Sequence, residues 1–417
     1  MIKRFLLALL SASVFTACDF QPNGIAKDDL SGKGLPAAQW RGEIALNDSV
    51  NLPFVFLTTA GDTNGSFSIR NAQEKVEGIW QKKGDSIEVT LNVFANFLRF
   101  SWQKDSSLAG YYQNPDAENY RLPFKARQAD KRFAADHDPC CDIDGEWAMD
   151  MNLEDSIPAE AIAYFEQTDR GLQGTVMTET GDYRYLDGVL EGRRLMLSTF
   201  DGGFLYYFEA EVLGDTMLAG HFWSGRSFHT RWAAKRDSNF RLANPDSLTF
   251  LKEGYSSIDF SFPDLSGQKL SLSDPQFANK PVIVQIMGSW CPNCMDESRY
   301  LKEVQAKHGE DLAIVGLTFE RARDRETALK RARKMQRDLD LPYPILLAGA
   351  TRDDKAEDAL PMLNHIMSYP TAIFLNKNHE VVRIHTGFSG PGTPKYQEFK
   401  ARYNRLIENL TSDNNTI

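Results

Sequence analysis

Two cysteines separated by two residues, Cys291 and Cys294, are the pair in this sequence best suited to chemistry. The spacing alone is ambiguous, because zinc sites and thiol redox sites both use it. A zinc site needs two more ligands, and Cys140 and Cys141 supply them only if another domain folds across the pair. The pair follows a buried-type strand, Pro281–Met287, and opens a predicted helix. Because a helix N-terminus stabilises a thiolate, this context favours redox chemistry.

The two sulfurs are expected to have different roles. Cys291 lies nearer the helix start, so we expect it to be exposed and to attack a partner disulfide, forming a mixed disulfide. Cys294, one turn deeper, then attacks Cys291 and releases the partner. Pro292 suits the first helical turn, because its missing N–H would have no helical partner there.

Strands and helices alternate around this pair, which is typical of an α/β domain with a mostly parallel sheet. The predicted domain covers residues 250–412 and follows a polar stretch near 239–247. Strands are expected at 281–287, 312–317, 343–347, 371–375 and 381–384. Helices are expected from the redox pair to about 307, over 324–339, over about 356–366, and after Thr393 and Pro394, which suit an N-cap and a first turn.

Residues 255–410 resemble the membrane-anchored, extracytoplasmic thioredoxin-like proteins of the TlpA and ResA type. The matching segments are Ile258-Asp259-Phe260, Pro263-Asp264-Leu265, Trp290-Cys291-Pro292-Asn293-Cys294 and Tyr369-Pro370-Thr371. The resemblance implies a thioredoxin fold, a cis peptide bond before Pro370, and thiol:disulfide oxidoreductase activity that needs no cofactor and no metal. It implies protein thiols and disulfides as partners and an upstream membrane electron donor.

The resemblance also suggests further site residues. Glu297 follows Cys294 by three residues, where that family carries an acidic residue, and could take the proton of the resolving thiol. The alternative is an exposed acid that is favourable near a helix N-terminus. Gln285 lies near the strand position where thioredoxin has a buried Asp. Trp290, Pro292 and Tyr369 are expected to contact the partner.

The direction of electron flow and two other functions stay open. Pro292-Asn293 differs from the dipeptide of ordinary thioredoxin, and the family resemblance favours a reductase over an oxidant. A thiol peroxidase is an alternative, although Met287–Trp290 does not match the peroxiredoxin segment Pro-x-x-x-Thr/Ser-x-x-Cys. A third hypothesis is a binding lipoprotein in which the N-terminal modules have the main role.

The N-terminal residues resemble a bacterial lipoprotein signal. Lys3 and Arg4 precede an apolar run that is too short to span a bilayer as a mature helix. Phe15-Thr16-Ala17-Cys18 then resembles a lipobox, although Phe15 stands where Leu is usual. It predicts a signal peptide at 1–17, lipidation of Cys18 and a tether at 18–37. The alternative is an ordinary cleaved signal with an incidental cysteine. The lipoprotein reading places the protein outside the cytoplasm, anchored to a bacterial membrane and facing the periplasm.

Residues 38–127 and 139–237 are predicted to be two copies of a β-rich module, either sandwiches or barrels. The matches pair 40–43 with 144–147, 77–80 with 187–190, and 105–110 with 215–220. Alternation in Ser86–Leu91 is typical of a half-buried strand, and Asn64-Gly65 and Asp201-Gly202-Gly203 are candidate turns. The aromatic residues of both copies are expected to lie in the core, namely Phe94, Phe97, Phe100, Trp102, Phe204, Tyr206, Tyr207 and Phe208.

Cys140 and Cys141 are adjacent, which makes a disulfide between them unfavourable. Their α-carbons are about 3.8 Å apart, whereas disulfides usually need about 4.4–6.8 Å. A labile regulatory pair, a relay to Cys291, a metal site with His137 and incidental thiols all stay open. The net charge of -10 argues against nucleic acid as a partner, because such proteins need a basic face.

Overall fold

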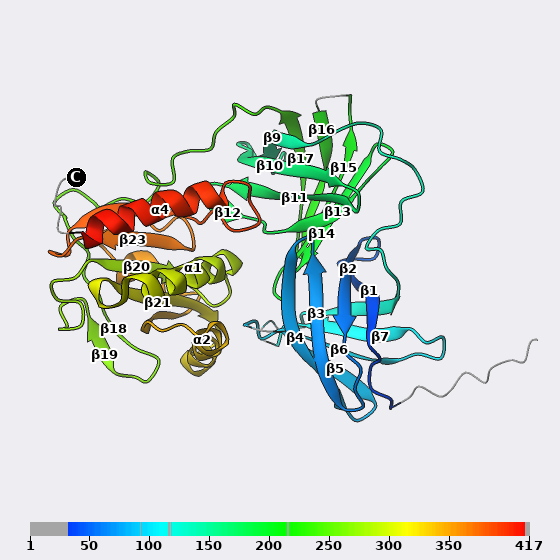
Figure 1. Ribbon diagram of the computed structural model, residues 1–417, viewed down its shortest axis with the longest axis horizontal. Coiled ribbons are helices and arrows are strands. Elements are labelled where there is room, and N and C mark those ends of the chain that lie inside the picture. The colour runs from blue at the N-terminus through cyan, green and yellow to red at the C-terminus, as the bar shows by residue number, and fades with distance from the viewer. Residues whose placement is uncertain (1–31, 92, 116, 118, 215–216, 413–417) are drawn as a thin grey trace, which may run out of the picture.

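The computed structural model describes residues 32–412 except 92, 116, 118, 215 and 216. Two β-barrels are followed by an α/β domain, which lies to the left in Figure 1 while the barrels lie to the right. The predictions for the signal peptide and for Cys18 lie outside the described residues. Within the described part of the chain, no helix is both long enough and apolar enough to cross a membrane.

The first unit is a closed antiparallel barrel in which β1 pairs with both β2 and β8. Its strands are β1 (Ala38–Ala45), β2 (Asn51–Thr58), β3 (Asn64–Asn71), β4 (Glu74–Lys83), β5 (Ser86–Leu91), β6 (Phe97–Trp102), β7 (Leu108–Gln113) and β8 (Arg121–Gln128). In β5 the buried side chains alternate with less buried ones, as the sequence predicts. Trp40, Trp80 and Phe56 fill the barrel interior, and closure leaves no free sheet edge.

The second unit closes in the same way, because β9 pairs with both β10 and β17 and β10 pairs with β11. Its strands are β9 (Gly145–Met151), β10 (Ala159–Thr168), β11 (Gly171–Thr178), β12 (Gly181–Asp182), β13 (Leu186–Glu191), β14 (Arg194–Phe200), β15 (Leu205–Val212), β16 (Met217–Ser224) and β17 (Phe228–Arg236). The short β12 pairs with the end of β11. The predicted β-rich modules are therefore barrels.

The second pair of segments that matched in the sequence lies on equivalent strands of the two barrels. Glu77–Trp80 is on β4 and Asp187–Leu190 is on β13, each the fourth long strand of its barrel. Gly110 on β7 and Gly220 on β16 also have the same surroundings. A Cβ at either glycine would lie about 2 Å from a carbonyl oxygen of the preceding strand, that of Arg99 or Glu209.

Two local expectations about the barrels are wrong. Asn64-Gly65 is not a turn, because both residues lie in β3, where they pair with β4. Phe94 does not enter a barrel core. With Val93 it packs against the core of the α/β domain, because the loop after β5 reaches that domain. Gly202 does lie in a turn, between β14 and β15, with a positive φ of 94°.

The α/β domain is built on a five-stranded sheet of order β22-β21-β20-β23-β24. The strands are β20 (Val282–Met287), β21 (Ala313–Ala322), β22 (Ile345–Thr351), β23 (Thr371–Leu375) and β24 (Val381–Thr386). The small hairpin β18 (Ser261–Pro263) and β19 (Lys269–Ser271) precedes them. β20, β21 and β22 are parallel, whereas β23 is antiparallel to β20 and β24 is antiparallel to β23.

Helices pack on this sheet, and apolar side chains bury the central strand β20 completely. The helices are α1 (Pro292–His308), the 3-10 turn η1 (Gly309–Asp311), α2 (Arg325–Leu339), α3 (Ala356–Ala359) and α4 (Tyr396–Thr411). Parallel strands need crossover helices, and α1 and α2 make these connections. The segment that carries Cys291 and Cys294 thus follows the carboxyl end of a buried strand.

Two predicted helix boundaries in this domain are wrong. The helix expected to reach residue 366 ends at Ala359, because Pro361 cannot continue it and Asn364 instead bonds the backbone of Phe250. The last helix begins at Tyr396, with Lys395 as N-cap. Thr393 does not cap it, because the Thr393 hydroxyl donates back to the Gly390 carbonyl at 2.9 Å.

Candidate active site

Cys291 lies at the N-cap of α1, directly after the turn that follows β20. Its Sγ accepts a hydrogen bond from the Cys294 N–H at 3.2 Å, so the sulfur occupies the position that a capping side chain usually fills. Pro292 takes the first helical position, as predicted. The sulfur therefore lies at the N-terminus of α1, where the helix dipole places partial positive charge.

Cys294 is completely buried one turn further along α1. Burial raises the pKa of its thiol well above the ordinary value, and the hydrogen bond and charge of Cys291 raise it further. Cys294 therefore holds its proton until a base removes it. These differences fit a nucleophile at Cys291 and a resolving thiol at Cys294.

Glu297 is also completely buried, on the next turn of α1. Burial raises the pKa of its carboxyl to about 8, although a hydrogen bond from Gln285 partly opposes that rise. Its Oε2 accepts from Gln285 Nε2 at 2.9 Å, and its Oε1 has no hydrogen-bond partner among the described residues. The carboxyl is thus able to take or release a proton near neutral pH, and it is not the exposed acid of the alternative interpretation.

Gln285 connects this carboxyl to the redox pair. Besides bonding Glu297, its Nε2 donates to the Cys294 carbonyl at 3.1 Å. Ser298 donates to its Oε1 at 3.0 Å, which fixes the amide orientation, and the Tyr343 hydroxyl lies 3.4 Å from the same oxygen. Gln285 therefore replaces a charged group at this strand position with a neutral bridge.

The Tyr369–Pro370 peptide bond is cis, as the family resemblance implied. The loop brings the Tyr369 carbonyl to the redox pair, where it accepts a hydrogen bond from Cys291 Sγ at 3.2 Å. The ring of Trp290 packs edge-on against the ring of Tyr369, with centroids 5.2 Å apart. Two of the three residues expected to contact a partner, Trp290 and Tyr369, thus lie together beside the sulfur.

Two residues on β21 that the sequence analysis missed position the turn before Cys291. Glu320, which is 1% exposed, accepts from the Ser289 N–H at 3.0 Å and from the Ser289 hydroxyl at 2.6 Å. The guanidinium of Arg321 lies 3.3 Å from the centroid of the Trp290 ring, a cation–π contact. Both lie three and four residues after the end of the predicted strand 312–317, near the carboxyl edge of the sheet. Ligand-binding and catalytic side chains of parallel sheets gather at that edge, so this position was the available signal.

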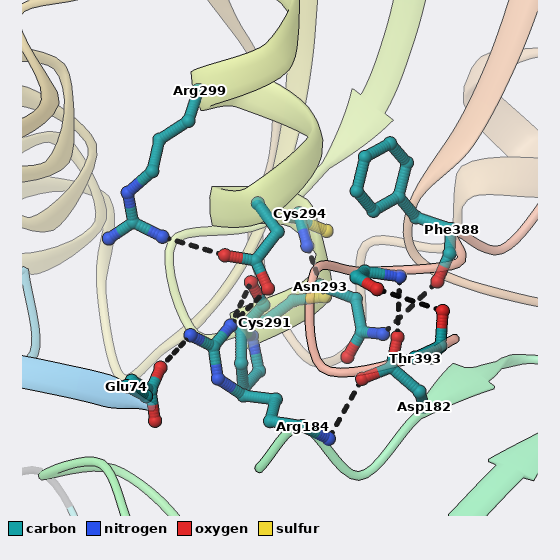
Figure 2. Close-up of polar contacts among 12 residues, drawn as sticks. Glu74, Asp182, Arg184, Cys291, Asn293, Cys294, Arg299, Phe388 and Thr393 are labelled. Atoms are coloured by element: carbon teal, nitrogen blue, oxygen red, sulfur yellow. Dashed lines mark hydrogen bonds and ion pairs between the residues drawn. The ribbon is translucent and has the colours of Figure 1, made fainter. Parts of the chain in front are cut away.

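The expectation that Cys291 is exposed is wrong, because the residue is only 4% exposed. The second barrel packs against the first turn of α1, directly after Cys291. Arg184 forms ion pairs with Asp296 on α1 and with Glu74 on β4, and its Nη1 also lies 3.3 Å from the Pro292 carbonyl (Figure 2). Pro292 is therefore buried beneath the barrel.

These charges lie at the junction of all three units. Burial raises the pKa of Asp296, and the guanidinium of Arg184 opposes that rise. Burial lowers the pKa of Arg184, but Asp296 and Glu74 outweigh it and raise the pKa above the ordinary value. No pattern in the sequence links Arg184 to the redox pair, because 112 residues separate it from Asp296.

The adjacent cysteines lie apart from this site, in the linker between the barrels. Their Sγ atoms are 2.8 Å apart, and the N–H of Cys140 donates to the carbonyl of Gly192, in the turn between β13 and β14. His137 pairs with Glu191 across 3.5 Å. Among the described residues, no three or more His, Cys, Asp or Glu side chains are grouped to hold a metal ion.

Comparisons with known proteins agree with this geometry. A sequence profile of the Redoxin family matches residues 252–399. Thioredoxin-like protein YneN of Bacillus subtilis is 32% identical over 137 residues, which cover 33% of this chain and 73% of that protein. Thiol-disulfide oxidoreductase ResA of Bacillus thuringiensis is 27% identical over 131 residues, covering 31% and 67%.

A thiol:disulfide interchange protein, DsbE of Vibrio cholerae, is 30% identical over 104 residues, which cover 25% of this chain and 52% of that protein. Among solved structures, a DsbF homologue from Corynebacterium diphtheriae superposes with a TM-score of 0.31 at 20% identity, covering 41% of this chain and 99% of that one. With its Cys-x-x-Cys segment, cis-proline loop and matching relatives, the chain belongs to the TlpA/ResA-type family of thioredoxin-like thiol:disulfide oxidoreductases.

Proposed function

We propose that this protein reduces disulfides of exported proteins through Cys291 and Cys294. The observation that carries the proposal is the N-cap position of Cys291, with its Sγ held between the Cys294 N–H and the Tyr369 carbonyl. A sulfur in this position lies at the helix N-terminus and beside the cis-proline loop at once, so a partner segment on that loop would place its disulfide next to the nucleophile.

The reaction is a sequence of two exchanges. The Cys291 thiolate attacks one sulfur of the partner disulfide, so that a mixed disulfide forms and the other partner sulfur leaves as a thiolate. Glu297 accepts the proton of Cys294, and the new thiolate attacks the Cys291 sulfur. The partner leaves with two reduced sulfurs, and Cys291 and Cys294 are left joined as a disulfide. A dithiol donor at the membrane returns the two electrons.

Other residues have supporting roles in this proposal. Pro370 holds the loop that receives the partner, and Trp290 and Tyr369 form the aromatic wall beside the sulfur. Pro292 contacts the partner only when Arg184 leaves its carbonyl. No cofactor enters the sequence of steps, because sulfur supplies both the nucleophile and the electrons.

We further propose that residues 1–17 direct export, that lipidated Cys18 anchors the protein to the membrane, and that 18–37 form the tether. The residues Thr16-Ala17-Cys18 after a short apolar run support this reading. The protein would then act outside the cytoplasm, facing the periplasm. In this proposal the rest of the chain forms two β-rich repeats, at 38–127 and 139–237, and a thioredoxin-like domain at 250–412. The shared strand order of the two barrels supports their origin by duplication.

Trapping of the mixed disulfide tests the function. A Cys294→Ser variant lacks the resolving thiol, so partner proteins are expected to accumulate on Cys291 and to be released by dithiothreitol. The matched control is Cys291→Ser, which keeps one thiol of the pair and should trap nothing. If the Cys294→Ser variant collects no protein while the wild-type pair still cycles with dithiothreitol, proteins are not the substrate.

A further inference from the structure

The connection between β11 and β13 crosses the redox site, and the α/β domain bonds its backbone as it would bond a bound peptide. The Ser368 hydroxyl, next to the cis-proline loop, donates to the Thr180 carbonyl at 2.6 Å. Asn293 lies between the two cysteines in sequence. With its amide oriented to satisfy both groups, Asn293 accepts from the Asp182 N–H at 2.9 Å and donates to the Asp182 carbonyl at 3.1 Å.

Side chains of the same connection are bonded as well. The Asp182 carboxylate accepts from the Gly390 N–H at 2.7 Å, and the guanidinium of Arg184 pairs with Asp296 (Figure 2). The segment Thr180–Arg184 therefore presents a carboxylate and, two residues later, a guanidinium to groups that surround the redox pair. The Asp182 carboxylate binds a backbone N–H, and the Arg184 guanidinium binds the buried Asp296 carboxylate on α1.

Glycines shape the surface beneath the segment. A Cβ added at Gly392 would lie 2.9 Å from the Arg184 carbonyl carbon, and one added at Gly390 would lie 2.9 Å from the Asp182 carboxylate. On the other side, a Cβ at Gly181 would lie 2.7 Å from the Asn293 amide. Contacts this close require a small residue on each side, so the fit is specific to this segment.

We propose that Thr180–Arg184 occupies the partner-binding surface of the redox site as a built-in cover, and that the protein partner binds there through an extended segment with an acidic residue followed by a basic one. The inference rests on the proposed function and adds to it the regulation and the partner chemistry of the same site. The low exposure of Cys291, 4%, is what such a cover predicts. Partner disulfides reach the sulfur only when the second barrel moves away from α1.

Alkylation of Cys291 tests the cover without any disulfide exchange. The full-length chain with Cys18, Cys140, Cys141 and Cys294 changed to Ser keeps Cys291 as its single thiol. In this background the sulfur is expected to react slowly with iodoacetamide, and more slowly still with a polymer-linked maleimide. The Arg184→Ala change is expected to raise both rates about tenfold, because opening of the covered site limits the reaction.

The matched control is Arg194→Ala, which removes an exposed ion pair to Glu209 on the same barrel and should leave both rates within about twofold. Gly392→Ala places a methyl group against the Arg184 backbone and so disturbs the same contact from the α/β domain. It is expected to raise both alkylation rates as Arg184→Ala does. Circular dichroism should show that both variants fold. Equal rates in the wild type, Arg184→Ala and Gly392→Ala would overturn the cover.

A nine-residue peptide of sequence 178–186 tests the partner chemistry. It is expected to slow the alkylation of Cys291 in the Arg184→Ala chain, whereas a peptide with Asp182 and Arg184 both changed to Ala should not. Equal protection of Cys291 by both peptides would contradict the proposal that the partner segment needs an acidic and a basic residue. Because none of these measurements uses a disulfide substrate, failure of the cover and failure of the proposed reductase function are distinguishable.

Discussion

A buried carboxyl, Glu297, lies beside Cys294 in an environment that disfavours its charged form. Its side chain has no exposed surface, and burial raises its pKa to about 8. The charged form is disfavoured because the site offers it one hydrogen bond, from Gln285, and no cation among the described contacts of that carboxyl. Such a group is suited to accept the proton of a neighbouring thiol whose own pKa is raised.

Glu297→Gln is expected to slow the single-turnover reduction of a peptide disulfide, on the order of 100-fold. Only the ionised carboxylate accepts a proton, so the wild-type rate should rise as the pH increases through about 8. The variant should lack that rise, while its amide oxygen still accepts from Gln285. The measurement is the rate as a function of pH, with Glu303→Gln, an exposed change on the same helix, as the control. An unchanged rise in the Glu297→Gln chain would assign it to another group.

Single elements carry much of the specificity of this fold. Strand β20 is buried throughout and ends just before the turn that holds Cys291. Helix α1 begins with Cys291 as its N-cap and carries the buried Cys294 and Glu297. In the barrels, strands approach so closely at certain points that only glycine fits. Gly110 and Gly220, on β7 and β16, are such points, because backbone oxygens occupy the space of a Cβ.

Gly110→Ala is therefore expected to destabilise the first barrel by about 2 kcal/mol, since the new methyl group must displace β6 or β7. Gly220→Ala should have a similar effect on the second barrel. The urea midpoint of unfolding measures both effects. The neighbouring change Ala109→Ser, at a residue that already has a Cβ, serves as the control. A Gly110→Ala chain as stable as the Ala109→Ser chain would show that the strand spacing is adaptable.

At the scale of the whole molecule, the three units are joined by buried arginines. Arg184 joins both barrels to α1. Arg132, in the linker, joins the barrels to each other. Its guanidinium donates to the Ser198 carbonyl at 2.9 Å and to Asn71 Oδ1 at 3.1 Å, and it lies 3.3 Å from the Asp187 carboxylate. The barrels are thus held by specific polar contacts as well as by apolar packing.

Arg132→Met is expected to loosen the contact between the barrels by about 3 kcal/mol, because it leaves a carboxylate and buried carbonyls without their donor. The linker should then be cut faster by a protease at low concentration. Lys131→Met changes the exposed neighbouring residue and is the matched control. Equal cleavage rates in the two variants would mean that apolar packing alone holds the barrels together.

Much of the α/β domain could be predicted from the sequence, because its signals are local. The strand before the cysteines, the helix that starts at them and the proline of the cis loop each lie within a few residues of the chemistry they serve. Alternation in segments such as Ser86–Leu91 likewise predicted the β-rich modules. Local spacing determines such elements, since helices and strands have fixed periods. The helix expected over about 356–366 ends at Ala359 instead, because Pro361 cannot continue it.

The sequence by itself was enough to recognise the family, to single out Cys291 and Cys294 as the candidate pair, and to predict the classes of the three units. Only the tertiary structure decided that Cys291 is covered, that Glu297 is buried, and that Arg184 meets Asp296. The physical reason is distance along the chain. Burial and ion pairing depend on segments more than 100 residues apart, and no local spacing encodes which barrel loop folds over a given helix.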